Sequence, residues 1–221
     1  MIVRRSNCST VALALWLAAA PAVARAQSAA ANALAPATAL ADSAYFAPNE
    51  PATAAKIGKT LHALRITGTP PRIDGTLDDE IWTRAQSAGD YLQWDPDNGE
   101  PATERTELQV AYDSRYVYVA IRCYDRAPDA IARGLARRDD QPPTDTVSVK
   151  FDPRHDHQTG YLFQTNPSGT QTDYFYYDDD RLDRDFDAVW EVRATTNQEG
   201  WVAEFRVPFS QMRFVTSPTP G

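Results

Sequence analysis

Apolar and polar residues alternate in short runs along much of this chain, and turn residues separate the runs. Every second position is apolar in residues 117–123 and again in residues 201–207. This period of two places the apolar side chains on one face of an extended strand. Turn signals, among them residues 113–115 and 197–200, recur roughly every ten residues. The pattern predicts an all-β fold, an antiparallel β-sandwich with one or two short helices.

Residues 73–82 interrupt the alternation with the sequence Ile-Asp-Gly-Thr-Leu-Asp-Asp-Glu-Ile-Trp. Asp74 and Gly75 are typical of a tight turn, because Asp bonds nearby backbone groups and Gly accepts a positive φ. Thr76 is placed to cap a helix N-terminus, with Asp79 at the capping-box spacing. We expect a short amphipathic helix here that packs on the core.

The first residues have the features of an export signal. Arg4 and Arg5 are basic, residues 11–20 are apolar but too few to span a bilayer, and residues 24–26 form a small-x-small cleavage site. The sequence therefore predicts that residues 1–26 are a signal peptide. We expect the chain in the periplasm, at the outer membrane or outside the cell.

Three further segments are expected after the signal. Residues 27–60 are rich in Ala, Pro, Ser and Thr and lack an apolar period, which predicts a flexible leader. Residues 61–216 are expected to form the sandwich, with a second short helix in residues 127–138, and residues 217–221 a tail. We expect a C-terminally truncated product or a fragment of a longer protein, because no further strand pattern closes the sandwich edge.

The composition argues against several partners. The net charge is −8, and the predicted signal removes three arginines and no acid. Nucleic acid and anionic membrane surfaces are therefore poor partners. Cys123 is the one cysteine after the signal, so no internal disulfide can form. Its place in an alternating strand favours a buried structural thiol.

The order of several short motifs resembles one known family. The motifs are Ile73-Asp74-Gly75 to Trp82, residues 106–124, Thr144-Asp145-Thr146-Val147 to Asp152, Thr159-Gly160-Tyr161, and Gly200-Trp201 to Pro208-Phe209. Over residues 64–214 the chain resembles the carbohydrate-binding module family 9-like domain. The version it most resembles lies at the N-terminus of bacterial outer-membrane proteins with a domain of unknown function predicted to be a β-barrel.

The resemblance implies a β-sandwich that binds sugar chains, often attached to glycoside hydrolases and sometimes associated with calcium. The chain departs from the sugar-binding members at one loop. In those members an aromatic residue just before the strand that starts here at Asp145 helps to clamp a terminal sugar. This chain has Gln141, Pro142 and Pro143 there, and the part that supplies the second clamp residue lies beyond its last strand pair.

Sugar recognition needs flat apolar rings and planar polar groups. The candidate ligand-binding residues are Trp94, Trp190, Tyr174, Tyr176, Gln164 and Asn166. The alternative for each aromatic residue is ordinary packing on the sheet. Trp82 and Trp201 fall on expected inner faces, and we assign both to the core.

Acidic residues crowd residues 173–187. Asp183, Asp185 and Asp187 have the spacing at the start of a calcium loop, and an ion with about six to eight oxygen ligands would relieve their repulsion. The glycine and glutamate that an EF-hand requires are missing. A solvated acidic loop with interleaved arginines is the alternative.

A second polar cluster consists of Asp152, His155, Asp156 and His157. Two histidines at i and i+2 can chelate zinc or copper if the backbone is extended. The alternative is a solvent loop that joins two strands, because Pro153 and residues 158–160 are turn-forming.

We expect a non-catalytic module that binds oligosaccharide or polysaccharide, in an exported protein of carbohydrate catabolism. The sequence has no serine-centred elbow, no HExxH helix and no phosphate-binding glycine loop, and it singles out no carboxylate pair for glycoside hydrolysis. One alternative is a structural or gating domain of an outer-membrane β-barrel protein with no sugar ligand. Another is a fragment of a secreted glycoside hydrolase. A third is haem binding, for which the available axial ligands are His62, His155, His157 and Met212.

Overall fold

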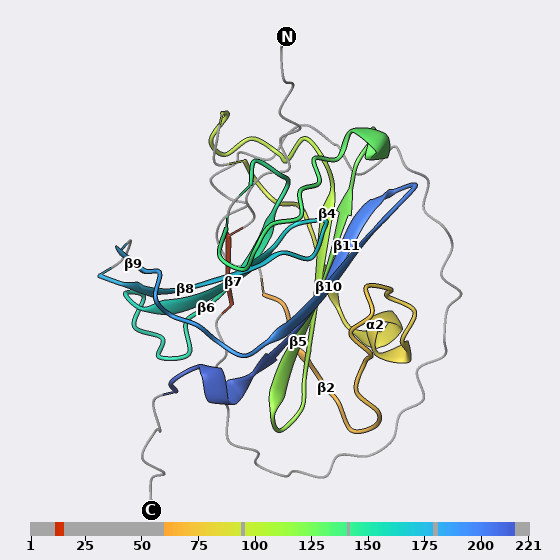
Figure 1. Cartoon of the computed structure of the whole chain (residues 1–221). Helices are drawn as coiled ribbons and strands as arrows, with labels where there is room; N and C mark the ends of the chain where they lie inside the picture. Colours follow the sequence, from red (N-terminus) through yellow and green to blue (C-terminus); the bar gives the residue numbers. More distant parts are fainter. Residues whose placement is uncertain (1–11, 16–59, 94–95, 141, 179–180, 215–221) are drawn as a thin grey trace, which may run out of the picture.

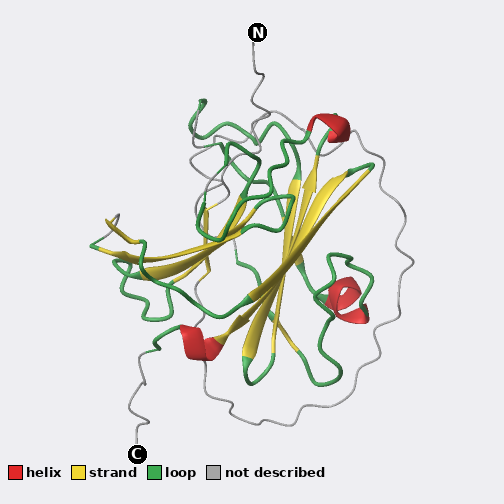
Figure 2. Cartoon of the chain, in the orientation of Figure 1, coloured by secondary structure: helices red, strands yellow, loops and turns green. Residues whose placement is uncertain are grey.

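In the residues that the structure describes, two β-sheets pack face to face (Figures 1 and 2). The computed structural model describes residues 12–15, 60–93, 96–140, 142–178 and 181–214. Helix in these residues is limited to α2 (Glu80–Arg84) and the 3-10 turns η1 (Pro128–Ala130) and η2 (Phe209–Gln211). None of the helices among these residues is long and apolar enough to cross a membrane. The predicted all-β sandwich is confirmed.

One layer is the six-stranded sheet, with the order β10-β11-β5-β4-β2 and β3 paired to β4. Its strands are β2 (Leu64–Arg65), β3 (Ser87–Ala88), β4 (Thr106–Tyr112), β5 (Tyr116–Tyr124), β10 (Glu191–Asn197) and β11 (Gly200–Pro208). β2 runs parallel to β4, and the other pairs are antiparallel. The turn between β4 and β5 is fixed by Asp113, whose Oδ1 accepts the backbone N–H groups of Arg115 and Tyr116.

The other layer is the five-stranded sheet, with the order β1-β6-β7-β8-β9. Its strands are β1 (Ala12–Leu15), β6 (Val147–Phe151), β7 (Gly160–Thr165), β8 (Gln171–Tyr177) and β9 (Arg181–Asp183). β6 to β9 pair antiparallel, and β1 lies parallel to β6, with Ala12 opposite Ser148. β1 falls inside the predicted signal peptide, so cleavage of that signal would leave this edge of β6 without its neighbour.

The inner faces of the two sheets enclose the main hydrophobic core. The ring of Trp190 lies between them, with its centroid 5.3 Å from that of Phe163 and 5.8 Å from that of Phe205. Cys123 and Trp201 are buried in the same core, as the sequence predicts. Removal of this apolar surface from water is the main force that holds the sheets together.

A second, smaller hydrophobic cluster lies on the opposite face of the six-stranded sheet, beneath α2 (Figure 1). Ile81 and Trp82 of α2 pack there with Ala111, Tyr118 and Ala120 of β4 and β5. Trp82 is 3% exposed and Tyr118 1% exposed. Trp82 is therefore a core residue, but it belongs to this outer cluster rather than to the space between the sheets.

The predicted cap at Thr76 is wrong. α2 begins at Glu80, and its N-cap is Asp79. The backbone N–H and the hydroxyl of Thr76 both donate to Oδ1 of Asp74, at 2.9 and 2.5 Å, so Thr76 closes the preceding turn instead. The Asp79 carboxylate is already engaged, because its Oδ2 accepts the backbone N–H of Arg72 at 2.9 Å.

The helix predicted in residues 127–138 is limited to the single turn of η1. The backbone beyond it bonds to other segments instead of to itself. Ala132 accepts from the N–H of Asp145 at 3.2 Å, and the N–H of Ala136 donates to the hydroxyl of Thr170 at 3.3 Å. These tertiary bonds replace the hydrogen bonds of a helix, so the local pattern alone was misleading.

Candidate functional site

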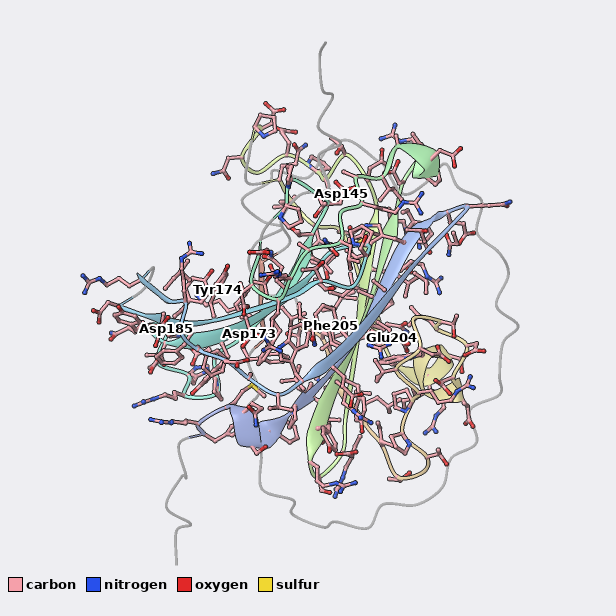
Figure 3. The ribbon with its side chains drawn as sticks, in the orientation of Figure 1. Asp145, Asp173, Tyr174, Asp185, Glu204 and Phe205 are labelled. Carbon is pink, nitrogen blue, oxygen red and sulfur yellow. The ribbon has the colours of Figure 1, made fainter. Side chains whose placement is uncertain are left out.

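Alternate residues of β6, β7 and β8 point away from the main core. We define the outer sheet face by Lys150, Leu162, Gln164, Tyr174 and Tyr176. Directly opposed residues of antiparallel strands share a face, and the register pairs Lys150 with Leu162 and Leu162 with Tyr174. The period of two then adds Gln164 and Tyr176 to the same face. The structure thus brings three of the six candidate ligand-binding residues together (Figure 3 labels Tyr174).

Each tyrosine of the outer sheet face lies beside a cation. Nζ of Lys150 is 4.1 Å from the ring centroid of Tyr176, and Cζ of Arg184 is 5.1 Å from that of Tyr174. A guanidinium nitrogen of Arg184 also donates to the Tyr174 hydroxyl at 3.3 Å. These contacts are attractive, because the face of an aromatic ring is electronegative. They fix the two side chains in place.

The solvent reaches only part of the outer sheet face. Leu162 is 6% exposed and Tyr174 4% exposed, whereas Lys150, Gln164 and Tyr176 are half-buried. The Gln164 amide and the Tyr176 hydroxyl make no hydrogen bond with any residue that the structure describes. Burial raises the pKa of Tyr176, which keeps its hydroxyl a neutral donor and acceptor. Both polar groups are therefore available to a ligand as far as the described residues are concerned.

Asn166, the fourth candidate, is committed to the fold. Its amide nitrogen donates to the Gly134 carbonyl at 2.7 Å, and its amide oxygen accepts the N–H groups of Ser168 and Thr170, both at 3.0 Å. It is 2% exposed. The hypothesis that Asn166 bonds a ligand does not fit this position, because its donors and acceptor shape the turn between β7 and β8.

The two tryptophan candidates are not part of the outer sheet face. Trp190 is 5% exposed and stacks on Phe205 in the main core. Its indole N–H donates to Oδ1 of Asp173 at 3.1 Å. A ring packed on both sides has no face for a sugar, so the position of Trp190 does not suit a binding platform. Trp94 lies outside the described residues.

The carboxylate of Asp173 organises the acidic region around Trp190. Asp173 is fully buried, accepts the N–H of Ala188 at 2.7 Å and pairs with the guanidinium of Arg138. Arg138 also pairs with Asp187 at 2.8 Å. Burial raises the pKa of Asp173, while its hydrogen bonds and Arg138 act against that rise. This network fastens the acidic segment to the loop before β6.

Asp183, Asp185 and Asp187 do not form the calcium site that their spacing suggested. Asp187 is held by Arg138, and Oδ1 of Asp183 accepts the backbone N–H of Asp185 at 3.0 Å. In the part of the chain that the structure describes, no three His, Cys, Asp or Glu side chains gather closely enough to hold a metal ion.

A second buried carboxylate, that of Glu204 on β11, lies between the six-stranded sheet and the segment that carries α2 (Figure 3). Its Oε2 accepts the N–H groups of Gly75 at 2.8 Å and Asp74 at 3.2 Å, and its Oε1 accepts the indole N–H of Trp82 at 2.8 Å. Burial outweighs these donors and raises the pKa of Glu204 to about 6. The turn and the tryptophan of residues 73–82 thus meet on one acid of the six-stranded sheet.

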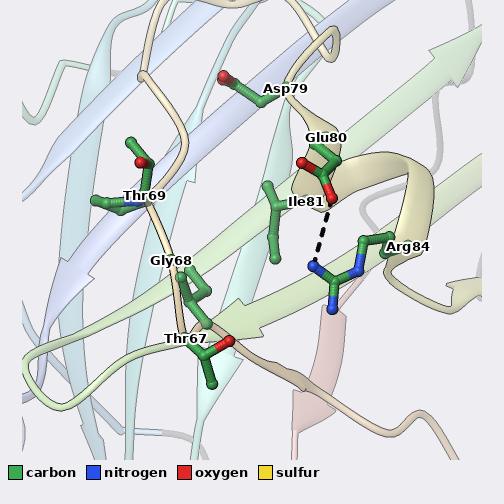
Figure 4. A pocket seen from close by; sticks show the side chains of 9 residues that line it. Thr67, Gly68, Thr69, Asp79, Glu80, Ile81 and Arg84 are labelled. Atoms are coloured by element: carbon green, nitrogen blue, oxygen red, sulfur yellow. Dashed lines mark ion pairs between the residues drawn. The ribbon is translucent and has the colours of Figure 1, made fainter.

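A surface pocket of about 180 Å³ lies beside α2 (Figure 4). Residues 66–70 line one side, and Asp79, Glu80, Ile81 and Arg84 line the other. Glu80 and Arg84 of α2 pair with each other at 3.6 Å. Because no aromatic ring lines it, the pocket lacks the flat apolar surface on which a sugar stacks.

The sequence interpretation missed the two cations of the candidate site. Lys150 stands at the polar position of an alternating strand, between Val149 and Phe151, so the period of two was a sufficient signal for its direction. Arg184 follows β9 in the acidic segment, and no local pattern indicates that it reaches back to Tyr174. Only the pairing of β8 with β9 brings the two together.

The molecule is a two-layer, mostly antiparallel β-sandwich whose five-stranded sheet has an aromatic and polar outer face. The chain belongs to the family described as carbohydrate family 9 binding domain-like, whose profile matches residues 73–221. This assignment agrees with the resemblance carried by the motifs in residues 73–82 and 200–209. No curated protein matches the sequence.

Similar solved structures include a carbohydrate-binding module of family 9 from Caldicellulosiruptor kristjanssonii in complex with glucose. Its TM-score is 0.47 at 16% identity, over 72% of this chain and 73% of that chain. A complex of a family 9 module from the same organism with cellotriose has the same TM-score and identity, over 72% of this chain and 71% of that chain.

Proposed function

We propose that this chain is a non-catalytic carbohydrate-binding module and that the outer sheet face contacts the sugar. The observation that carries the proposal is the pair of polar groups on one face of the five-stranded sheet, the Gln164 amide and the Tyr176 hydroxyl, to which no described residue is hydrogen-bonded. Membership of the family supports the same ligand class. Sugar hydroxyls need planar amides and phenols as partners, and the half-buried Tyr176 ring adds apolar surface.

The spacing of the two groups favours an oligosaccharide or polysaccharide over a single sugar. Tyr176 pairs with Gly160, four residues before Gln164 on β7. Four residues of extended strand span about 13 Å. A ligand that touches both groups therefore lies along the sheet. Lys150, beside Tyr176, adds a donor with no acidic partner among the described residues.

The wider setting extends the proposal. We place the module in an exported protein of carbohydrate catabolism, on the strength of the basic and apolar pattern of residues 1–26 and of the family. A downstream outer-membrane β-barrel or catalytic domain would be its partner in a full-length protein.

Affinity gel electrophoresis with plant and microbial polysaccharides tests the ligand and the face together. We expect retardation by at least one polysaccharide, with a loss of at least about fivefold in affinity for Gln164→Ala and Tyr176→Ala, since each variant removes roughly 1 kcal/mol of contact. Tyr124→Ala is the matched control. Tyr124 is also a half-buried strand tyrosine beneath a cation, Arg105 at 4.6 Å, but it belongs to the six-stranded sheet.

Two outcomes would overturn the proposal in different ways. Equal losses in Tyr124→Ala and Tyr176→Ala would reject the outer sheet face as the site. No retardation by any polysaccharide would reject sugar binding itself.

A second candidate function is a structural or gating domain of an outer-membrane β-barrel protein with no sugar ligand. It is favoured by the cations that already occupy the tyrosine rings, Lys150 at Tyr176 and Arg184 at Tyr174. It is also favoured by Pro142 and Pro143 in the loop before β6, where a clamp ring is expected in sugar-binding relatives. This function predicts unretarded migration in every gel.

A further inference from the structure

The loop that joins β6 to β7 carries two of the three histidines of the chain. His155 and His157 are both exposed, and their ring centroids are 5.3 Å apart at an interplanar angle of 61°. We propose that these two imidazoles bind one divalent transition-metal ion, with Zn²⁺ as the probe ion. This site is separate from the outer sheet face and does not depend on sugar binding.

The separation of the rings suits a chelate. A zinc–nitrogen bond of about 2.0–2.1 Å places the metal roughly 3.2 Å from each ring centroid. Two imidazoles at an angle of roughly 90–109° about one metal then have centroids about 4.5–5.2 Å apart. The observed 5.3 Å lies just above that range. The separation of the rings is therefore compatible with a shared ion.

The loop is held in this shape by two carboxylates. Asp152 accepts the backbone N–H groups of Arg154 at 3.1 Å and His157 at 2.9 Å. Asp156, between the two histidines, accepts the N–H of Thr159 at 2.7 Å and its hydroxyl at 2.8 Å. A pre-ordered loop lowers the entropy cost of binding an ion.

The backbone of both histidines is unusual. His155 has φ +53° and His157 φ +58°, in the left-handed region that residues other than glycine rarely adopt. Such conformations cost energy, persist only where the surroundings enforce them and cluster at ligand sites. Here they bring the two rings to the same side of the loop, where they meet edge to face.

The nearby charges allow a cation to approach. The one cation on the loop, Arg154, is paired with Asp156 at 3.3 Å. Imidazole suits zinc, copper and nickel among divalent ions. No third His, Cys, Asp or Glu among the described residues completes a cluster, so the proposed site has two protein ligands from this part of the chain. The site is accordingly open and exchangeable, unlike a closed structural zinc site.

Zn²⁺ titration of the full chain, followed by NMR of the histidine ring signals, tests the proposal. We expect two of the three histidines to shift together at one ion per chain, and the binding to weaken as the pH is lowered because only neutral imidazole binds. His155→Asn and His157→Asn should each weaken Zn²⁺ binding by at least about tenfold. Asn suits these variants because it tolerates the left-handed region.

His62→Asn is the matched control, because His62 is exposed but lies far from the loop in sequence, and it should leave the affinity unchanged. Urea unfolding of each variant is the control for the fold, and a cooperative transition like that of the wild-type chain shows that the fold is intact. The proposal is overturned if the wild-type rings do not shift together, or if either loop variant binds Zn²⁺ as tightly as the wild-type chain.

Discussion

The carboxylate of Glu204 explains two residues of the segment 73–82, Gly75 and Trp82. Gly75 presents its backbone N–H to Glu204 with φ +85°, which favours glycine, and Trp82 presents its indole N–H to the same acid. The sequence alone predicted the turn and the helix, since their signals are local. It could not predict their shared partner, which lies 129 residues further along the chain.

We predict that Glu204→Gln destabilises the fold by about 2 kcal/mol, measured by urea unfolding. In Gln an NH₂ group replaces one of the two carboxylate oxygens. This donor then faces another donor, either the indole N–H of Trp82 or the backbone N–H groups of the turn, and one hydrogen bond is lost. Glu191→Gln is the control, because Glu191 is 52% exposed and pairs with Arg206 on the surface. Its cost should stay below about 0.5 kcal/mol. Equal costs in the two variants would contradict this role of Glu204.

The pH dependence of stability gives an independent measure of the same acid. The folded-state pKa of Glu204 is raised to about 6 from 4.5, so the folded chain binds this proton more tightly than the unfolded chain. Its contribution to the free energy of unfolding therefore falls as the pH rises from 4.5 to 6, by up to about 2 kcal/mol. Glu204→Gln should flatten this slope. Part of it remains, because the pKa of Asp173 is also raised.

At the scale of elements, alternation predicted the strands and the directions of their side chains. Tyr174, Tyr176 and Gln164 share a face because the period of two is a property of any extended strand. What covers each face was not predictable from the period. Tyr118 lies on the polar face of β5 yet is buried, because α2 packs over it from residues 80–84.

Asn166 and Trp190 lie away from the outer sheet face for different reasons. Asn166 follows the end of β7, where a turn uses its amide, so the strand period no longer governs its direction. Trp190 immediately precedes β10 in the sequence and faces the main core. Whether an aromatic residue near a strand binds a ligand or packs inside depends on the second sheet, and the alternation of one strand carries no information about that.

The turn between β10 and β11 supplies a prediction at this scale. Gly200 has φ +141°, and an added Cβ would collide with the carbonyl oxygen of Cys123 on β5. We expect Gly200→Ala to destabilise the fold by at least about 3 kcal/mol in urea unfolding. Gly169 has φ +78° with open space around its Cα, so Gly169→Ala should cost only about 1 kcal/mol. The steric explanation would be refuted if Gly169→Ala lowered the free energy of unfolding by more than Gly200→Ala does.

In the assembled sandwich, the edge of β6 depends on a neighbour that lies within the predicted signal peptide. β1 pairs with this edge, from Ala12 opposite Ser148 to Leu15 opposite Phe151. If residues 1–26 are removed as a signal, alternate amide groups of β6 lose their partners, and an unpaired strand edge is prone to association.

We predict faster hydrogen exchange in a chain that starts at Gln27. The amide hydrogens of Val147–Phe151 that point toward β1 should exchange at least about tenfold faster than they do in the full chain. Hydrogen exchange resolved by residue is the measurement. β11 is the internal control, because it lies between β10 and β5 and should exchange alike in both chains. Unchanged protection of β6 would show that the pairing with β1 contributes nothing to this edge.

The hydrogen bonds between residues 73–82 and Glu204 can form only after most of the chain has been synthesised. Gly75 and Trp82 leave the ribosome long before β11 is made, so their partner does not yet exist. The N–H groups of the turn and the indole must stay hydrated until nearly the whole sandwich has been translated, since a contact between such distant positions forms late. A ribosome that stalls before residue 204 therefore holds a chain whose first motif is complete in sequence and still unfolded.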